Sequence, residues 1–246
     1  MFSLCIPTMD RYDSFLKEYL PKYINNDYIS EIIICDENGN DVQKIKNNFP
    51  ENEKLKLHTN SQKLGPFLNK MKCCNFSSNK WIALIDSDNF VDIDFFEKTK
   101  NYIDNNNLEE NVILSPCWAK PRFNYSYLNN KILNKNTLKS LNINKAPHNY
   151  TPITVLMNTG NYIINKYLID NININNDLEL INNSSACDVI LFNTLLFEQL
   201  DLNLIVIPDL TYSHVVHDGS TYIQNCNQTK NYIKVVHDRF NKLINL

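Results

Sequence analysis

The sequence has few glycines, no long hydrophobic run and no paired-cysteine motif. No apolar run approaches the roughly 18 residues that a membrane span needs, and the start, MFSLCIPTMD, lacks the basic and apolar segments of a secretory signal. We therefore expect no transmembrane segment. Because glycine is scarce, each one is expected where the backbone needs a positive φ or a close approach. The four glycines are Gly39, Gly65, Gly160 and Gly219.

The seven cysteines are irregularly spaced, and only Cys73 and Cys74 lie together. Without a C-x-x-C pair, a zinc ribbon or a disulfide scaffold is disfavoured, and we expect a reducing, cytoplasmic location. The net charge of −3 and the lack of a basic helix argue against a nucleic-acid partner. The 43% of hydrophobic residues is ordinary for a soluble globular domain.

Short apolar runs alternate with helical periodicity through the first half of the chain. Buried strands are predicted over 2–6, 31–35, 55–58, 81–85 and 112–114, and helices over 10–24, 66–76 and 92–106. This alternation predicts an α/β fold with a Rossmann-like, mostly parallel central sheet flanked by helices. Ligands of such sheets bind at the carboxyl ends of the strands, so polar residues that follow apolar strands are the first candidates for a site.

The second half is less regular. A helix is predicted over 184–200, a strand over 204–207 that Pro208 ends, and a closing helix over 230–246. Residues 111–169 contain no acid but seven basic side chains, which favours a solvated surface over a basic flap near a phosphate. Neither a repeat nor a linker interrupts the pattern, so we expect one domain.

The strongest candidate motif is Asp86-Ser87-Asp88, directly after the apolar run WIALI. Two carboxylates two residues apart can face one cavity if the strand breaks into a turn there. They repel each other unless a cation lies between them, and Mg²⁺ or Mn²⁺ prefers such oxygen ligands. The alternative is a helix N-cap role for Asp88 or Asp92.

Further candidates follow other strands or open helices. Asp36, after EIIIC, could bind a base or ribose, or could be an ordinary turn acid before Gly39. In the run from His214 to Ser220, one of His214 and His217 could ligate a metal. Lys70, on a helix that follows Gly65, could reach a pyrophosphate or lie on the surface.

Asp188 opens a predicted amphipathic helix. Composition alone favours a first-turn acid that complements the helix dipole. Trp118 could stack on a sugar or pack in the core.

In their order along the chain, these features resemble the GT-A fold nucleotide-sugar glycosyltransferases, above all the inverting enzymes of glycosyltransferase family 2. That family opens with a strand ending in Pro-Thr, followed by a strand ending in acids. An Asn, Gly and basic segment precedes its D-x-D turn, and a glycine-containing strand, a helix acid and a histidine run come later. The matching residues are Pro7-Thr8, Glu31–Glu37, Asn60, Gly65, Lys70, Asp86–Asp88, Asn158–Asn161, Asp188 and His214–Ser220.

The resemblance implies a donor site and a metal site. Pro7, Thr8 and Asp36 would hold the nucleoside, with Asp36 reading the base. Lys70 would approach the diphosphate or ribose. The acidic turn, Asp86, Ser87 and Asp88, would complete the donor site. Asp88 would ligate the metal, with Asp86 and His217 as further ligands and His214 as the alternative histidine.

Asp188 would be the general base that deprotonates the acceptor hydroxyl, with Asp177 or Glu179 as competitors if the alignment slips. Residues 1–116 would bind the nucleotide sugar, and residues 117–246 would bind the acceptor and end in the C-terminal helix. The implied reaction is metal-dependent, inverting transfer from a nucleotide sugar, a UDP-sugar in the first place, to a hydroxyl of a glycan or other acceptor. The alternatives are a non-catalytic binding module of the same fold and a metal-dependent phosphoesterase; the oligomeric state stays open.

Overall fold

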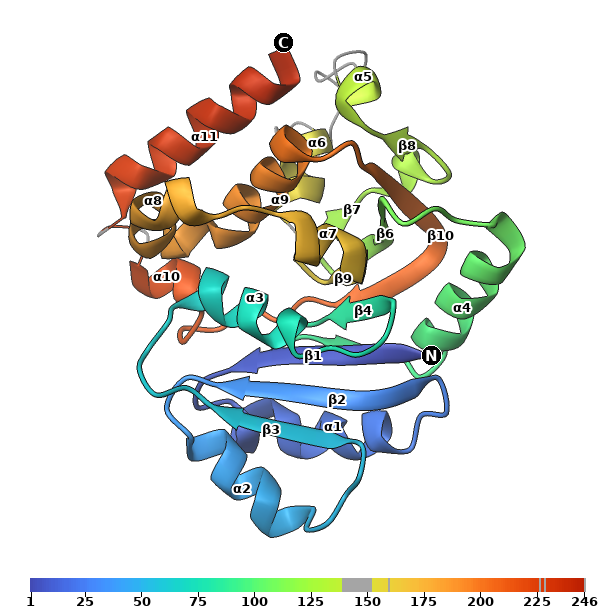
Figure 1. The fold of residues 1–246 in the computed structure, drawn as a ribbon, viewed down its shortest axis with the longest axis vertical. Helices are drawn as coiled ribbons and strands as arrows, with labels where there is room; N and C mark the ends of the chain where they lie inside the picture. Colours follow the sequence, from blue (N-terminus) through green and yellow to red (C-terminus); the bar gives the residue numbers. More distant parts are fainter. Residues whose placement is uncertain (139–151, 159, 226, 228, 246) are drawn as a thin grey trace.

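The computed structural model describes residues 1–138, 152–158, 160–225, 227 and 229–245. Within them, one mixed sheet of ten strands runs through the molecule in the order β3-β2-β1-β4-β9-β6-β10-β5, with β7 beside β6 and β8 beside β10 (Figure 1). The α/β fold class is confirmed.

The strands follow the apolar runs, with short additions at the sheet margins. Their bounds are β1 Phe2–Thr8, β2 Ile29–Asp36, β3 Leu55–Thr59, β4 Trp81–Leu84, β5 Phe90–Val91, β6 Val112–Lys120, β7 Phe123–Asn124, β8 Ile132–Leu133, β9 Tyr162–Asn165 and β10 Asn203–Ser213.

Helices fill most of the connections. The α-helices are α1 Lys17–Ile24, α2 Asn40–Asn48, α3 Pro66–Asn75, α4 Phe95–Asn106, α5 Lys135–Leu138, α6 Pro152–Met157, α7 Lys166–Asn171, α8 Leu178–Asn183, α9 Asp188–Gln199, α10 Thr221–Asn225 and α11 Lys230–Asn245. A π-helical turn, Tyr12–Leu16, precedes α1, and 3₁₀ turns cover Ser126–Leu128, Asn175–Asp177 and Ser185–Cys187.

The four strands β3, β2, β1 and β4 are parallel, as predicted. Their register places Thr8 opposite Asp36, and Asp36 opposite Thr59. Ile85, which follows β4, donates its backbone N–H to the carbonyl of Cys5 in β1. The residues that follow these strands therefore meet at one edge of the sheet, which is where the sequence predicts a ligand site.

The main path of the sheet is mostly parallel, as predicted, and β9 is an exception. This strand lies between β4 and β6 and runs antiparallel to both. A short run such as YIIN shows that a strand is buried but not its direction, because a strand buried on both faces reads as a continuous apolar run whichever way it runs. The direction is set by the path of the chain between β6 and β9.

The prediction that Pro208 ends the strand over 204–207 is wrong. β10 continues to Ser213, and its pairing with β6 shifts between Ile207 and Thr211. Proline cannot donate to the ladder, so it is accommodated where pairing is already interrupted. Asp209 has φ +58°, which marks the irregular turn of the backbone at this point. The extension carries the chain toward the edge where β1 and β2 end.

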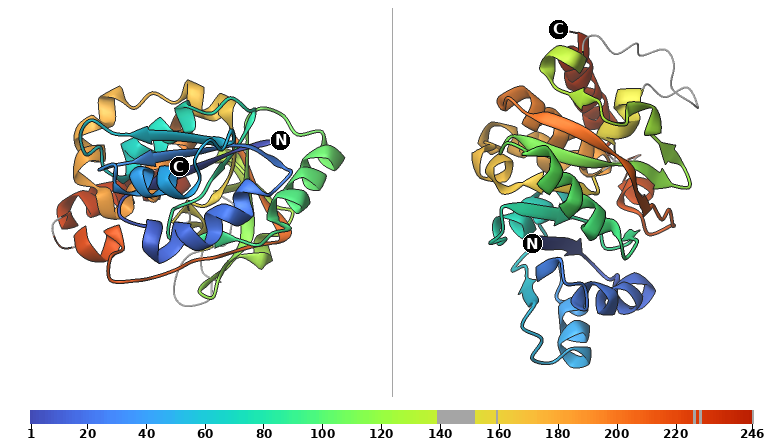
Figure 2. Two further views of the ribbon diagram at one scale, coloured as in Figure 1. Left: turned by 90° about the horizontal axis from the view of Figure 1, so that it is seen from below. Right: turned by 90° about the vertical axis from the view of Figure 1, so that its right-hand side faces the viewer.

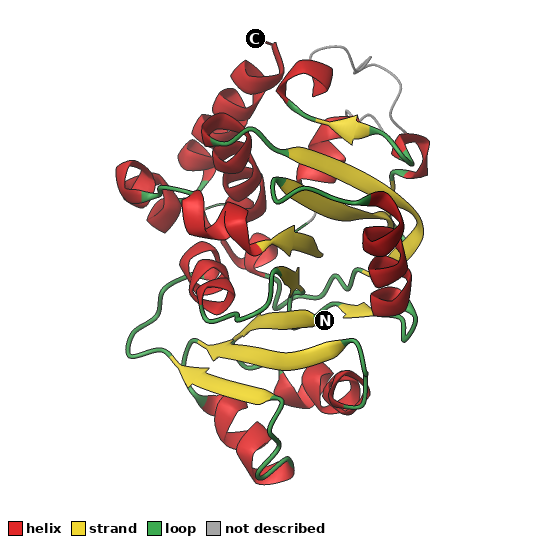
Figure 3. Ribbon diagram, turned by 45° about the vertical axis from the view of Figure 1, so that its right-hand side comes forward, coloured by secondary structure: helices red, strands yellow, loops and turns green. Residues whose placement is uncertain are grey.

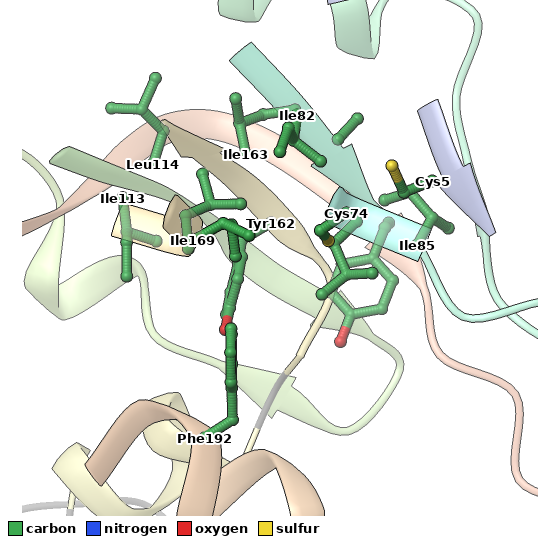
Figure 4. Close-up of a cluster of buried hydrophobic side chains, with 14 of the residues drawn as sticks. Cys5, Cys74, Ile82, Ile85, Ile113, Leu114, Tyr162, Ile163, Ile169 and Phe192 are labelled. Atoms are coloured by element: carbon green, nitrogen blue, oxygen red, sulfur yellow. The ribbon is translucent and has the colours of Figure 1, made fainter. Parts of the chain in front are cut away.

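Helices cover both faces of the sheet (Figures 2 and 3). α1 and α4 pack on one face, while α3, α7 and α9 pack on the other (Figure 2). α9 is buried along most of its length, because eight of its twelve residues are buried. Figure 4 shows Tyr162, Ile163 and Phe192 among the side chains of the core between this helix layer and the sheet.

Among the described residues, no single helix is long and apolar enough to cross a membrane. One pair of helical segments, Asn175–Asn183 with Ser185–Gln199, meets that test only when joined across a bend of 98°, by length and composition.

The buried hydroxyl of Tyr162 donates a 2.7 Å hydrogen bond to the side-chain oxygen of Asn193. Tyr162→Phe leaves that oxygen without this donor, so we expect the free energy of unfolding to fall by about 1–3 kcal/mol. Urea denaturation measures the change, with Tyr167→Phe as the control because Tyr167 is 44% exposed. Equal stabilities of the two variants would contradict the role of the buried hydrogen bond.

Candidate functional site

The candidate site lies where β1, β2 and β4 end. Thr8 and Asp36 are the last residues of β1 and β2, and Asp86 follows β4 by one residue. The acidic helix start Asp188 and the loop of His217 reach the same edge from the second half of the chain, as the contacts below show.

Asp36 is fully buried, and its carboxylate caps α2. One oxygen accepts the backbone N–H groups of Asp41 and Val42 at 2.8 and 3.0 Å, and the other accepts that of Asn38 at 3.2 Å. Gly39, at φ +86°, makes the turn that brings these N–H groups back to the carboxylate. A carboxylate with these partners stabilises the start of α2. These contacts account for Asp36 without a bound base, so recognition of the base by Asp36 stays a prediction.

Asp41 organises the loop that follows β1. Its carboxylate accepts the Thr8 hydroxyl at 2.5 Å and the backbone N–H groups of Arg11 and Tyr12 at 2.8–3.0 Å. Sequence reasoning missed this residue. The only signal was an acid two residues after Gly39, in the first turn of a helix.

Pro7 and Thr8 are both buried in β1. The residues that are predicted to contact the nucleoside therefore lie at the end of a rigid strand.

Glu37, the second acid of the turn after β2, faces a different segment. Its carboxylate accepts the backbone N–H of Leu64 at 2.7 Å and the amide of Asn60 at 3.3 Å. Asn60 also bonds Asn69 of α3 at 2.9 Å. Glu37 therefore ties the segment before α3 to the end of β2, a role that the sequence did not reveal.

Lys70 links two acids that are far apart in the chain. Its ammonium lies 2.8 Å from Asp188 Oδ2 and 3.1 Å from Asp86 Oδ1. The three side chains are only 11%, 14% and 26% exposed for Lys70, Asp188 and Asp86. The structure thus joins three predicted site residues in one ion-pair chain, from α3, the acidic turn and the start of α9.

Burial and charge act in opposite directions at this lysine. Burial alone would lower the pKa of Lys70, but the carboxylates of Asp188 and Asp86 outweigh it and raise the pKa above its ordinary value. Burial raises the pKa of Asp188, and the Lys70 ammonium offsets only part of this effect. Asp188 is therefore a stronger proton acceptor than an exposed aspartate.

The acidic turn is held by Asn161, which precedes β9. Its side-chain oxygen accepts the Asp86 backbone N–H at 2.7 Å, and its amide donates to Asp86 Oδ2 at 3.3 Å. Ser87 is buried within the turn, and the Asn89 N–H closes it onto the Asp86 carbonyl at 3.0 Å. The two oxygens of Asp86 are thus engaged by Lys70 and Asn161.

Asp88 and His217, 129 residues apart in the sequence, are in contact. His217 Nε2 lies 3.0 Å from Asp88 Oδ2, and the two side chains are 23% and 21% exposed. The Gly219 N–H donates to His217 Nδ1 at 3.1 Å, which directs the opposite ring nitrogen at Asp88. The juxtaposition that the sequence predicted is present.

The loop of His217 is fastened to the first half of the chain at several points. Arg11 donates to the Gly219 carbonyl at 2.6 Å, and the Phe15 ring lies 5.1 Å from the His217 ring. Asn89 accepts the Val215 N–H at 2.9 Å. The side chain directly after the D-x-D turn thus positions the histidine loop.

His214 faces the aromatic side of the site. Its ring lies 5.3 Å from Phe123 in an edge arrangement, and its Nδ1 atom is buried with no hydrogen-bond partner among the described residues. Burial lowers the pKa of His214, while Asp86 and Asp88 act in the opposite direction. His217, not His214, makes the direct contact with Asp88.

A carboxylate and an imidazole are both ligands that divalent cations take. Here His217 Nδ1 accepts the Gly219 N–H, so Nε2 carries a ring proton and donates it to Asp88 at 3.0 Å; a cation bound at Nε2 would require that proton to leave. The described residues contain no group of three or more His, Cys, Asp or Glu placed to hold a metal. Mg²⁺ typically takes its remaining ligands from substrate phosphates and water, so two protein ligands suffice.

The acceptor side is less defined. Trp118 in β6 is partly buried against the core, and the Lys120 ammonium lies 5.7 Å from its ring. The predicted acceptor half, residues 117–246, lies partly outside the described residues, since 139–151, 159, 226, 228 and 246 are not among them. Neither Asp177 nor Glu179 joins the Lys70 chain: Asp177 pairs with Arg239.

This fold and these residues define an α/β domain with an acidic turn at the edge of the sheet where ligands of parallel sheets bind. The family model for Glycosyl transferase family 2 matches residues 3–164, and the chain belongs to this family. Membership places it among the glycosyltransferases. A search of curated proteins gives no match.

Solved glycosyltransferases share the fold at low identity. Staphylococcus aureus TarS matches with a TM-score of 0.64 at 13% identity, over 96% of this chain and 38% of that one. TarS residues 1–349 in complex with UDP-GlcNAc gives 0.64 at 13%, over 97% and 66%. A mannosyltransferase from Pyrobaculum calidifontis, in complex with GDP-Man and Mn²⁺, gives 0.56 at 13%, over 99% and 67%. The chain thus spans little more than a third of the longer TarS chain, and the predicted GT-A fold is confirmed.

The capping role of Asp36 is testable. Asp36→Asn replaces one acceptor oxygen by an amide that cannot accept, so we expect the free energy of unfolding to fall by about 1–2 kcal/mol. Asp10→Asn is the control, because Asp10 accepts only the exposed amides of Asn38 and Asn40. If calorimetry instead showed lost UDP binding at unchanged stability, Asp36 would be a base-reading residue and not a cap.

Proposed function

We propose that this chain transfers a sugar from a nucleoside-diphosphate sugar to a hydroxyl of a glycan or other acceptor, with inversion and with Mn²⁺ or Mg²⁺. The observation that carries the proposal is the meeting of Asp88 with His217 beside the Lys70 ion-pair chain, at the edge where ligands of parallel sheets bind. A UDP-sugar is the first donor to test, since one structural neighbour was solved with UDP-GlcNAc.

The donor would lie between the strand ends and the acidic turn. Pro7 and Thr8, at the end of β1, would contact the nucleoside. Asp36, or Glu37 after it, would be the acid that binds the base. Lys70 brings a buried positive charge to the side where the diphosphate would lie. Asp86 and Ser87 would complete the donor site from the acidic turn.

Asp88 and His217 would hold the cation, with Asp86 as a further ligand if it releases Asn161 or Lys70. When bound, the ion would neutralise the charge that develops on the leaving diphosphate. The site is built so that Arg11 and Asn89 fix the histidine loop before any ligand enters.

Asp188 would accept the proton of the acceptor hydroxyl. It opens α9, so the helix N-terminus fixes its position, and burial raises its pKa. A carboxylate in this place supplies typically 10²–10⁴-fold of rate. A single displacement at C1 inverts the anomeric centre.

A cytoplasmic location is also proposed. All six cysteines in the described residues are free thiols, which agrees with a reducing compartment.

Metal-dependent donor binding tests the Asp88 assignment. With Mn²⁺, the parent chain should bind UDP in calorimetry and release a nucleoside diphosphate from at least one nucleotide sugar. Asp88→Ala should lower the affinity at least about tenfold, because the cation loses a carboxylate. Asp104→Ala is the control, since the ion pair that Asp104 forms within the described residues is with Lys100 on the same helix, α4. Equal binding by the two variants would refute the assignment, and phosphodiester hydrolysis without a donor would favour the phosphoesterase alternative.

Asp188→Asn separates catalysis from binding. We expect it to retain the fold and donor binding but to lose transfer by about 10²–10⁴-fold. In the parent chain, the rate should fall as pH falls through the raised pKa of Asp188, at higher pH than for an exposed aspartate, because only the ionised carboxylate accepts a proton. Unchanged turnover in Asp188→Asn would mean that another residue is the general base. Donor binding without turnover by the parent chain would indicate a non-catalytic module.

A further inference from the structure

The Lys70 contact creates a conflict for the proposed general base. Asp188 Oδ2 already accepts from the Lys70 ammonium at 2.8 Å, so one of its oxygens is occupied. An ammonium also lowers the affinity of a carboxylate for a proton. Lys70 thus positions Asp188 and also offsets part of the rise in the pKa of Asp188 that burial causes.

The space around the ammonium is tight. A Cβ atom added at Gly160 would lie 3.6 Å from Lys70 Nζ and 2.8 Å from a methyl of Val189. Lys70 is therefore confined between the acidic turn, the start of α9 and the segment before β9. Two of its three donor directions point at Asp86 and Asp188.

A bound diphosphate would compete for the same ammonium. Asp86 belongs to the turn that carries Asp88, so the proposed cation and the diphosphate would lie on the Asp86 side of Lys70. Phosphate oxygens form strong charge-assisted hydrogen bonds with an ammonium. A diphosphate at this point attracts Lys70 away from Asp188.

We propose that Lys70 is a positioning residue that holds Asp188 and exchanges this contact for one with the diphosphate when the donor binds. The proposal rests on the proposed function. It makes the base fully available once the diphosphate has taken over the ammonium.

The chemical step then balances without further reactants. The acceptor hydroxyl gives its proton to Asp188 as its oxygen forms the new bond to C1. The bond from C1 to the phosphate oxygen breaks, and the nucleoside diphosphate leaves with the electron pair. Lys70 keeps its proton throughout and pairs with the leaving group.

A double-mutant cycle tests this exchange. Calorimetry with UDP and Mn²⁺ is applied to the parent chain, Lys70→Gln, Asp188→Asn and the double variant. Asp188→Asn should bind UDP at least about threefold more tightly, because the competing charge is gone, and Lys70→Gln should bind about tenfold more weakly. In the Lys70→Gln background, the Asp188→Asn gain should disappear, since no ammonium remains to be exchanged.

The cycle distinguishes exchange from simple repulsion between Asp188 and the diphosphate. Repulsion alone predicts the same gain in both backgrounds, and that additive result would overturn the proposal. Lys166→Gln and Asp170→Asn are matched controls, because this ion pair, with 2.6 Å between its charged atoms, lies on α7 and its side chains are 25% and 50% exposed. If Lys70→Gln does not fold, Lys70→Met replaces it in the cycle, and the same additive result would overturn the exchange.

The failure of the proposal is distinguishable from failure of the proposed function. A parent chain that binds neither UDP nor GDP with Mn²⁺ overturns the proposed function and the exchange with it. UDP binding with additive effects overturns the exchange alone. Lys70→Arg should restore most of the UDP affinity that Lys70→Gln loses, because its charge still reaches a phosphate.

Discussion

The contact of the Lys70 ammonium with two carboxylates is the interaction on which the site depends. Asp86 and Asp188 come from different halves of the chain, and both are largely buried with Lys70. Removing the lysine would leave two like charges side by side in a poorly solvated place, which is strongly unfavourable. Lys70 therefore joins the acidic turn to the start of α9. Its positive charge acts on any proton transfer or phosphate binding at this edge of the sheet.

A second set of contacts ties the histidine loop to the first half of the chain. Arg11 holds the Gly219 carbonyl, Asn89 holds Val215, and His217 meets Asp88. The strand β10 reaches this point because its pairing with β6 resumes after the irregularity at Pro208. The two halves of the molecule thus share one sheet and one site, and neither half contains a complete set of the proposed ligands and base.

The order of motifs along the chain was sufficient to predict the fold and the edge of the sheet where the candidate residues gather. Apolar runs before Asp36 and Asp86 marked the strand ends correctly, because a buried parallel strand needs continuous apolar residues. The sequence did not reveal the contacts that Asp41, Asn161 and Arg11 make. These side chains act through hydrogen bonds to backbone groups distant in sequence, and neither spacing nor periodicity records such partners. The direction of β9 was not predicted for a related reason, since a short buried run does not show which way its strand runs in the sheet.

By itself, the amino-acid sequence determined the α/β fold class, the edge of the sheet where polar residues gather, and the presence of an acidic turn, a helix acid and a histidine run. Those features follow from local patterns of apolar and polar residues. Only the tertiary structure decided that Asp36 caps α2 while Glu37 binds the segment before α3, and that Lys70 pairs with Asp188 as well as with Asp86. Pairing of charges 118 residues apart depends on how the layers pack, because the chain between them leaves many other arrangements open.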